Sequence, residues 1–267
     1  MSDRATYPES TDARWANLEW QIMGPQVFAP AMNMAIDEVL TDRVGRGEMK
    51  PTLRFWGWSA PCVVLGRFQS VQNEVRPEAM AEHGIALVRR ISGGGAMFIQ
   101  PSGAITWSIH VPESFVEGLS FAESYSFLDS WVVRGLRDLG IDAWYAPLND
   151  ITSAAGKIGG AAQARRTGAV LHHTTIAYDM DTEVLVDVLR VGEEKLSDKG
   201  TRSAAKRVDP LKRMTGMTRE GLIEAMSARF RSLTGARPAD IPADAVAAAE
   251  RRVAEQFATD DWIYLLP

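Results

Sequence analysis

Three consecutive glycines, Gly93 to Gly95, separate two stretches that resemble strands, and they constrain this chain more than any other feature. The surrounding segment is RRISGGGAMFIQ, residues 89–100. Glycine in a strand context marks a bulge or a close approach by another backbone or a ligand. Three in a row add flexibility that folding must remove, at a cost in conformational entropy. A bound anion that contacts Arg89 or Arg90 would offset that entropy cost.

The glycine run has the chemistry of an anion-binding loop. Main-chain N–H groups of consecutive glycines can approach phosphate oxygens because no Cβ stands in the way. Arg89 and Arg90 end the preceding strand, so alternation predicts that they point to opposite faces and that one reaches the loop's ligand. The segment lacks the Gly-Lys-Ser/Thr of a P-loop and the GxGxxG spacing of a dinucleotide fold. From this segment alone, a plain glycine bulge is an equal alternative.

The composition is that of an ordinary globular protein. The 267 residues are 46% hydrophobic and 24% charged, which is ample material for a core. A net charge of −5 argues against broad nucleic-acid binding. The single cysteine, Cys62, excludes an internal disulfide and suits a reducing compartment. No apolar run approaches the roughly 18 residues of a membrane span, and the N-terminus has no apolar signal core. We therefore expect a cytoplasmic protein with no nucleic-acid and no membrane partner.

The spacing of apolar residues predicts an α+β domain. We expect residues 1–14 to form a flexible N-terminal arm and residues 15–267 to form a single domain. Because the strands cluster in the middle and helices flank them, α+β is favoured over alternating βαβ units. Strands are predicted at 18–24, 52–58, 62–68 and 84–90, in a hairpin of 96–99 with 104–111, and in two strands within 157–181. Helices are predicted at 31–47, from Pro77, and at 120–140, 182–190, 218–235 and 243–259, with a capping box at Ser120 and Glu123.

A second segment of interest is LNDITSAAGKIGGAAQ, residues 148–163. Lys157 is surrounded by Gly and Ala, so its ammonium could closely approach a carbonyl or phosphate of a ligand. A cation there could stabilise charge that develops on an oxygen during a reaction. Asn149 and Asp150 precede it, and Asp150 could hold Lys157 in its charged form or bind Mg²⁺. A surface turn with a solvated lysine is the alternative, and on this segment alone it is the favoured one.

The third segment, LHHTTIAY (171–178), contains two adjacent histidines. In a strand His172 and His173 alternate faces, so at most one enters a given pocket. A zinc site is disfavoured because no cysteine or HExxH spacing accompanies them. We expect one hydrogen-bonded core histidine and one exposed histidine rather than a catalytic base. Cys62 lies in an apolar strand, where we expect it to fill the core and not to act as a nucleophile.

Taken together, six segments resemble the lipoate-protein ligase A family, which belongs to the wider group of biotin ligases and lipoyl or octanoyl transferases. They occur in the order and spacing of the family and span roughly residues 17 to 264. The matching segments are VVLGRFQS (63–70), RRISGGGAMF (89–98), NDI (149–151), GKIGGAAQ (156–163), LHHTTI (171–176) and KLSDKGTRSAAKRV (195–208). The resemblance implies a biotin/lipoate ligase-like catalytic domain, with central mixed or antiparallel sheets flanked by helices, over residues 15–267.

The resemblance implies a two-step ligase. Lipoate and ATP, with Mg²⁺, would form lipoyl-adenylate, and the lipoyl group would pass to a lysine of an apo lipoyl domain of a 2-oxo-acid dehydrogenase or of the glycine-cleavage H protein. Lys157 matches the catalytic lysine, Asp150 is the Mg²⁺ candidate, and residues 195–208 match the loop that covers the adenylate. The residues placed at ATP or lipoyl-adenylate are Arg90, Gly93, Gly94, Gly95, Ala96, Met97, Phe98, Asn149, Asp150, Lys157 and His173.

The charges suit that chemistry. Adenylation brings a carboxylate up to an α-phosphate, and these two anions repel each other. Arg90, Lys157 and Mg²⁺ would screen the repulsion and stabilise the charge in transfer. A covering loop would keep water from hydrolysing the mixed anhydride. The three glycines of the opening segment would then admit a phosphate, and the arginine would neutralise it.

This sequence departs from the family pattern in three places. Ile99 and Gln100 replace a common His-Asp, and Thr174 replaces a Gly that often follows the paired histidines. Both changes could reshape the pocket. Third, the chain stops at DDWIYLLP, where many such ligases continue into an accessory domain of about a hundred residues. Some relatives carry that domain on a separate protein, so we expect either a separate small accessory partner or a chain that performs only the transfer.

The main alternative is an octanoyltransferase that acts from octanoyl-acyl carrier protein without ATP. Related cysteine-dependent transferases carry a nucleophilic cysteine in the loop before the lysine motif, whereas WYAPLND here contains none. Direct lysine-assisted transfer stays open. Biotin ligation is a weaker alternative because the segment RRISGGG is closer to the lipoate branch. A non-catalytic relative that binds lipoyl domains is the last alternative, and the presence of Lys157 and Arg90 disfavours it.

Overall fold

The computed structural model describes residues 12–190 and 210–266, and all structural statements refer to these residues. Eight of its strands form one mixed sheet in the order β11-β1-β2-β6-β10-β9-β8-β7, and three form a smaller sheet in the order β4-β3-β5. The strands are β1 Gln21–Phe28, β2 Thr52–Trp58, β3 Cys62–Leu65, β4 Ala86–Arg89, β5 Met97–Ile99, β6 Ala104–Pro112, β7 Ala143–Ala146, β8 Asp150–Ser153, β9 Gly156–Arg166, β10 Ala169–Ala177 and β11 Arg237–Ala239.

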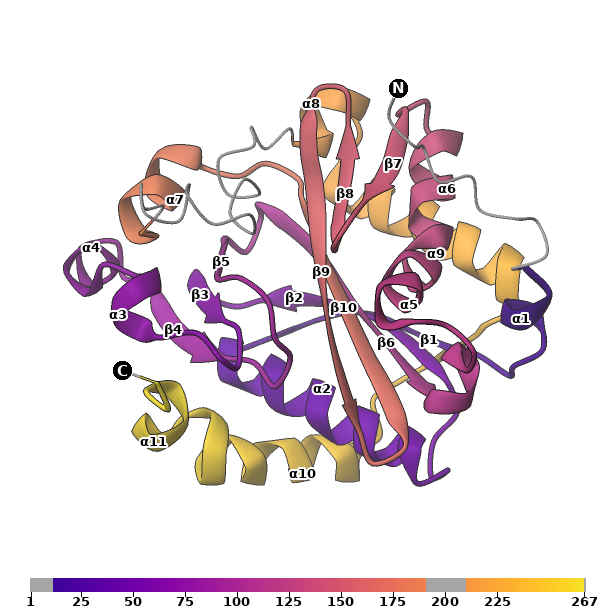
Figure 1. The fold of residues 1–267 in the computed structure, drawn as a ribbon, viewed down its shortest axis with the longest axis horizontal. Coiled ribbons are helices and arrows are strands. Elements are labelled where there is room, and N and C mark those ends of the chain that lie inside the picture. The colour runs from indigo at the N-terminus through magenta and orange to yellow at the C-terminus, as the bar shows by residue number, and fades with distance from the viewer. Residues whose placement is uncertain (1–11, 191–209, 267) are drawn as a thin grey trace.

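Helices cover both faces of the large sheet (Figure 1). The consecutive strands β8, β9 and β10 pair antiparallel with no helix between them, and helices flank the sheet, so the fold is α+β, as the sequence predicts. The helical segments are α1 Asp12–Ala16, α2 Pro30–Gly45, α3 Val71–Glu74, α4 Pro77–Glu82, η2 Glu113–Val116, α5 Phe121–Leu128, α6 Ser130–Asp138, α7 Thr182–Val188, α8 Leu211–Thr215, α9 Arg219–Thr234, α10 Ala243–Arg252, the π-helical turn η4 Val253–Phe257 and α11 Asp260–Ile263.

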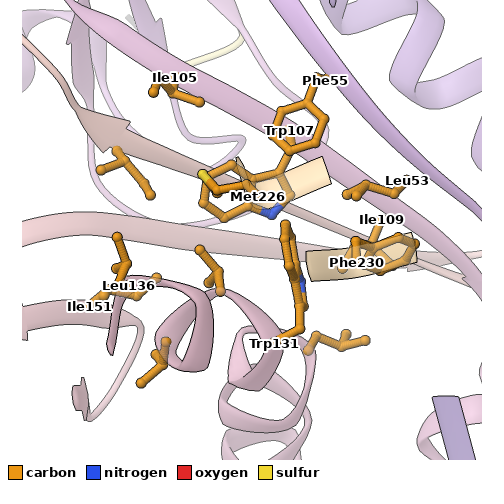
Figure 2. Close-up of a cluster of buried hydrophobic side chains, with 14 of the residues drawn as sticks. Leu53, Phe55, Ile105, Trp107, Ile109, Trp131, Leu136, Ile151, Met226 and Phe230 are labelled. Atoms are coloured by element: carbon orange, nitrogen blue, oxygen red, sulfur yellow. The ribbon is translucent and has the colours of Figure 1, made fainter. Parts of the chain in front are cut away.

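The two faces of the large sheet carry separate cores. On one face, α6 and α9 pack against β2 and β6, and Figure 2 shows Trp107 beside Trp131 at the centre of this core. Their rings meet edge-on with centroids 5.6 Å apart, which is the favourable geometry for an aromatic pair. On the other face, α2 and α10 lie side by side and cover Trp56 and Leu171. The central strands β2, β6 and β10 are thus closed to water on both faces, and polar side chains between these layers need partners.

The small sheet has its own core, formed with α3, α4 and α7. β3 is its middle strand, parallel to β4 and antiparallel to β5. The glycine-rich segment connects β4 to β5, so it begins and ends at the same small sheet. The predicted hairpin of 96–99 with 104–111 is wrong, because β5 pairs with β3 while β6 belongs to the large sheet. Backbone pairing with a distant strand overrode the local turn signal at residues 100–103.

The predicted helix at 120–140 is two helices, α5 and α6, that meet at Asp129. The predicted capping box is present, since Ser120 and Glu123 hydrogen-bond each other's backbone N–H groups. The carboxylate of Asp129 accepts hydrogen bonds from the side chains of Thr174 and His172, and this tertiary contact coincides with the break. Strands β7 and β8 lie where the sequence predicted no strand, because each is four residues long and carries little periodic signal.

Two predicted features lie at the limits of the described residues. Of the arm predicted at 1–14, residues 1–11 are outside them, and residues 12–14 belong to α1. The predicted covering loop, 195–208, lies wholly outside them. Within residues 12–190 and 210–266, no helix is both long enough and apolar enough to cross a membrane.

Candidate functional site

Lys157 lies near the start of β9 and forms an ion pair with Asp150 at the start of β8, with Nζ 2.8 Å from Oδ1. The lysine side chain keeps 24% of its surface exposed, while the Asp150 side chain is 6% exposed. The ammonium is therefore partly accessible from the surface of the protein. The two side chains that the sequence placed together are thus paired, while the effect of Asp150 on the charge of Lys157 stays a prediction.

Gly160 leaves the space that the Lys157 ammonium occupies. A Cβ at position 160 would stand 3.2 Å from Nζ of Lys157 and 3.7 Å from Oδ1 of Asp150. The register of β8 against β9 shifts between Ile151 and Thr152, so Lys157 and Gly160 meet although they are three positions apart. Irregular pairing of this kind re-aims side chains next to functional sites.

Asn149 holds the edge of β9 beside the ion pair. Its side-chain Nδ2 donates to the carbonyl of Ala161 at 2.7 Å, and the backbone N–H of Ala161 donates to the carbonyl of Asn149 at 2.9 Å. The side-chain amide thus replaces a missing strand partner, because the paired part of β8 begins only at Asp150. Contact of Asn149 with an adenylate stays a prediction.

Arg90 is buried beneath the glycine loop and bonds to its backbone. Its Nη2 donates to the carbonyls of Gly93 at 2.6 Å and Gly95 at 2.9 Å, and its Nε donates to the hydroxyl of Ser92 at 3.0 Å. The residue is 4% exposed, and burial lowers the pKa of Arg90 to about 10, so it stays charged at neutral pH. In this arrangement the guanidinium is committed to the loop's own carbonyls. Its predicted contact with a nucleotide therefore stays a prediction.

Arg90 binds two carbonyls of the glycine loop and none of its amides. In the part of the chain described, the backbone N–H groups of Gly93, Gly94 and Gly95 have no acceptor. Gly94 has φ of +91°, and both Gly94 and Gly95 are exposed. A Cβ at Gly94 would lie 3.9 Å from Cβ of Ala162, which places the loop over the same strand as Lys157. Successive free amides of this kind form a site for an anion or a polarised carbonyl oxygen.

Arg89 points the other way, as strand alternation predicts. It is fully buried and donates to carbonyls of the 66–69 turn, including Gln69 at 2.7 Å, and to Ile263 at the end of α11. A Cβ at Gly66 would stand 2.1 Å from the carbonyl oxygen of Gly94. Arg89 thus fixes the turn against which the glycine loop packs.

The remaining predicted loop residues face the interior. Phe98 is 2% exposed and belongs to the small-sheet core, against which Ala96 also packs. Met97 packs against the core that α2 and α10 cover. Any contact of these three residues with ATP stays a prediction, and their side chains here serve packing.

Both histidines of β10 are buried, so the expectation of one exposed histidine is wrong. His172 is 0% exposed and bonds to Oδ1 of Asp129 at 2.9 Å, while His173 is 8% exposed and bonds to Asp37 at 3.1 Å. The physical reason is that β10 is an inner strand with covered faces, so both alternating positions are enclosed. A lining role for His173 in an acyl pocket stays a prediction.

Cys62, the single cysteine of the sequence, lies in the core of β3 as expected. It is fully buried, and burial raises the pKa of its thiol, which disfavours the thiolate. A cysteine nucleophile is therefore not part of this site.

Asp150 by itself is a poor match for the predicted Mg²⁺. Its carboxylate is engaged by Lys157, and no group of three His, Cys, Asp or Glu side chains suited to a metal occurs within residues 12–190 and 210–266. Magnesium is held by one or two carboxylates together with substrate phosphates. These residues alone do not make a magnesium site.

The sequence patterns did not indicate two residues that bond to the His173 ring. Ser92 bonds to His173 with Oγ 2.6 Å from Nε2, and Asp37 of α2 lies on the far side of the same ring. Ser92 sits within the segment singled out first, but nothing in its neighbours shows a histidine 81 positions away. Asp37 lies within the helix predicted at 31–47, and the spacing of apolar residues there does not show that its side chain is buried. The structure shows that it is 1% exposed.

Comparison with known sequences and structures agrees with this architecture. The sequence model described as the lipoyl protein ligase A/B catalytic domain matches residues 29–231. Octanoyltransferase LipM from Kyrpidia tusciae is 32% identical over 273 residues, which cover 92% of this chain and 98% of that protein. Octanoyltransferase LipM from Exiguobacterium sp. is 30% identical over 278 residues, which cover 92% and 98%.

Solved structures share the fold. A chain from an archaeal lipoylation system of Thermoplasma acidophilum, described as a bi-partite lipoate protein ligase and its E2 lipoyl domain, superimposes with a TM-score of 0.79 at 28% identity, and the match covers 94% of this chain and 98% of that one. Lipoate-protein ligase A bound with ATP gives a TM-score of 0.79 at 24% identity over 94% and 100% of the two chains, a likeness of fold. The expected ligase-like architecture of mixed sheets flanked by helices is confirmed.

Proposed function

Because the chain belongs to the lipoyl protein ligase A/B catalytic domain family, we propose that it transfers an octanoyl group from an acyl carrier protein to a lysine of a lipoyl domain. The names of the two relatives described above, octanoyltransferases at 32% and 30% identity, favour this alternative over the ATP-dependent ligase expected first. ATP and Mg²⁺ are then not required, and the acyl donor is a thioester.

One observation supports acyl transfer at this site more than any other. The ammonium of Lys157 lies beside Gly160 of β9, and the loop with the unbonded amides of Gly93 to Gly95 approaches Ala162 of the same strand through Gly94. Both are hydrogen-bond donors that suit a carbonyl oxygen on which negative charge develops. Pre-oriented donors of this kind are the usual source of rate enhancement in acyl transfer.

The proposed step is direct aminolysis. The neutral ε-amine of the lipoyl-domain lysine attacks the thioester carbonyl, and the negative charge forms on the carbonyl oxygen, which Lys157 and the loop amides stabilise. The C–S bond then breaks, the amide C–N bond is complete, and the proton lost by the amine ends on the released thiol. Atoms and electrons balance without a further reactant. Since Cys62 is buried in β3, no acyl-cysteine intermediate is included.

Transfer from an acyl-adenylate is the second candidate. The likeness to the bi-partite lipoate protein ligase at 28% identity favours it, and the absence of a cysteine near Lys157 is consistent with it. Free glycine amides suit the phosphate of an adenylate as well as a carbonyl oxygen. In this case a lipoyl group would be transferred, and activation by ATP would need this chain, with or without a separate small accessory protein.

An intact-mass assay on one apo lipoyl domain separates the two candidates. The domain is incubated with this chain and, in parallel, with octanoyl-carrier alone, with lipoate and Mg-ATP, or with synthetic lipoyl-adenylate. An octanoyl gain with carrier and no ATP supports the first proposal. A lipoyl gain with either of the other donors, and no gain with carrier, replaces it by the second.

Each arm has two controls. Omitting this chain measures spontaneous acylation of the lysine by the donor. A lipoyl domain whose acceptor lysine is changed to arginine shows whether the gain is at that lysine. If none of the three donors acylates the domain above these controls, both candidates are wrong and the non-catalytic lipoyl-domain-binding alternative stands, which a binding measurement with the same domain then tests.

A further inference from the structure

A buried chain of hydrogen bonds joins α2 to the glycine loop. Asp37 is 1% exposed, and its Oδ2 lies 3.1 Å from Nδ1 of His173. Nε2 of the same ring lies 2.6 Å from Oγ of Ser92, and Oγ lies 3.0 Å from Nε of Arg90. Four polar side chains from three separate segments (α2, β10 and the connection from β4 to β5) therefore form one hydrogen-bonded chain, which ends on the carbonyls of Gly93 and Gly95.

The surroundings of Asp37 keep it ionised. Burial pushes the pKa of this carboxyl up, but the hydrogen bond with His173 and the nearby His110 and Arg54 outweigh burial and lower the pKa. Arg54 donates to Oδ1 at 3.2 Å, and Ser108 donates to Oδ2 at 2.7 Å. An ionised carboxylate can only accept, so Nδ1 of His173 must carry the proton of this hydrogen bond.

The direction of the remaining bonds follows from that proton. Burial lowers the pKa of His173, so the ring is neutral near pH 7 and its Nε2 is an acceptor. The hydroxyl of Ser92 must then donate to Nε2, which turns an oxygen lone pair toward Arg90. Arg90 can only donate, and its Nε does so to Ser92 while its Nη2 holds the two glycine carbonyls.

We propose that Asp37, His173 and Ser92 form a positioning relay that fixes the orientation of Arg90 and thereby holds the glycine loop. Ser92 and Asp37 act through Arg90 and do not touch the acyl group. Ser92 is 1% exposed and its hydroxyl is engaged on both sides, which argues for positioning and against a nucleophilic serine. The relay itself stands on the geometry, while its effect on turnover rests on the proposed function.

Two substitutions at His173 separate the two ends of the relay. In His173→Asn the side-chain amide can still donate to Asp37 from about the Nδ1 position, but no acceptor remains for Ser92. In His173→Gln the amide oxygen can reach about the Nε2 position and accept from Ser92. We expect His173→Asn to match Ser92→Ala, with kcat/KM lower by roughly 10- to 100-fold, the loss typical of a misplaced catalytic group. We expect His173→Gln to lose clearly less.

A double-mutant cycle tests whether the residues act as one unit. If the relay exists, Ser92→Ala combined with His173→Asn lowers kcat/KM no further than either change alone. Independent, multiplying losses would overturn the proposal. Ser227→Ala is the matched control, because Ser227 is also a buried serine but lies in α9, away from the loop, and turnover should be unchanged. Thermal melting of each variant shows which ones fold.

A readout that needs no activity keeps the relay testable if the proposed function fails. Imidazole ¹⁵N shifts should report a neutral His173 ring with the proton on Nδ1, and the amide signals of Gly93 to Gly95 should move in Ser92→Ala but not in Ser227→Ala. A ring protonated on Nε2, or unmoved glycine amides, would overturn the relay. A wild-type chain with these spectra but no acyl transfer would refute the function and leave the relay standing.

Discussion

At the scale of single residues, the two cations of the site have different environments and different tasks. Lys157 is partly exposed beside Asp150, so a substrate can reach it. Arg90 is buried and donates hydrogen bonds to backbone carbonyls of the protein itself. A flexible lysine suits contact with a group that arrives and leaves, and a rigid, multiply donating guanidinium suits holding a loop. Under the proposed function, the charge of Lys157 would serve the reaction, whereas the charge of Arg90 holds the loop.

Lys157→Ala tests the catalytic assignment. Loss of a donor to developing negative charge is expected to lower kcat by at least roughly 10²-fold, while the fold is retained. Steady-state acylation of a lipoyl domain measures the rate, and circular dichroism checks the fold. Lys50→Ala is a matched control, since Lys50 also forms an ion pair, with Glu19, but at an exposed site. Near-wild-type turnover in Lys157→Ala would remove the proposed role.

At the scale of elements, β9 does most to build the site. Its pairing with β8 is irregular near Lys157. Its two adjacent glycines, Gly159 and Gly160, have different structural roles. A Cβ at Gly159 would stand 2.6 Å from the backbone carbonyl oxygen of Thr175 on β10, whereas a Cβ at Gly160 meets side-chain atoms, the end of Lys157 at 3.2 Å and Oδ1 of Asp150 at 3.7 Å. The first glycine lets two strands approach each other, and the second leaves room for an ammonium.

Gly159→Ala and Gly160→Ala are therefore expected to fail in opposite ways. Gly159→Ala forces backbone to move and should lower the free energy of unfolding by about 1 to 3 kcal/mol, the usual cost of overpacking. Gly160→Ala displaces a flexible side chain and should leave the free energy of unfolding nearly unchanged while kcat falls roughly 10- to 100-fold. Urea titration and steady-state kinetics on both variants check this. Equal effects on stability would contradict the assignment.

At the scale of the whole molecule, covering both faces of the large sheet encloses a set of ionisable groups. Asp37, Arg54 and His110 lie together between α2 and the sheet, each at most 1% exposed. Burial lowers the pKa of Arg54 to about 10 and that of His110 to about 4. At neutral pH the pair of Asp37 and Arg54 is charged and His110 is neutral. This enclosed set makes stability depend on pH.

The free energy of unfolding should fall as the pH drops from about 6.5 to about 4. In that window an unfolded chain protonates His110 at its ordinary pKa, while the folded protein does not, so protons favour unfolding. The lowered pKa of His110 contributes roughly 3 kcal/mol above pH 6.5 that is lost by pH 4. His173, whose pKa burial also lowers, adds to the loss in the same direction.

Urea unfolding at several pH values measures this dependence. In His110→Asn, which keeps a donor for Thr41 near the position of Nδ1, the slope between pH 6.5 and pH 4 should be shallower than in wild type. The comparison is made on slopes, because the substitution also changes stability at neutral pH. An identical slope in the variant would show that His110 titrates normally in the folded protein.

Local patterns predicted much of this protein but not its buried network. The α+β class, the helices at α2 and α9 and the opposite directions of Arg89 and Arg90 follow from periodicity, which acts between neighbours in the chain. Lys157 and Asp150 lie seven positions apart, so local spacing suggested their pairing. Asp37 and His173 are 136 positions apart, and no local pattern links them. The hairpin predicted at β5 failed because β5 pairs instead with β3.

The sequence by itself determined the kind of chemistry available: three glycines without side chains, a lysine among small residues and a single cysteine in an apolar strand. These properties belong to residue types and do not depend on distant contacts. Only the tertiary structure decided how the groups are used. Burial directed Arg90 to the glycine carbonyls and enclosed both histidines, because a buried polar group must bond to whatever the fold brings within reach.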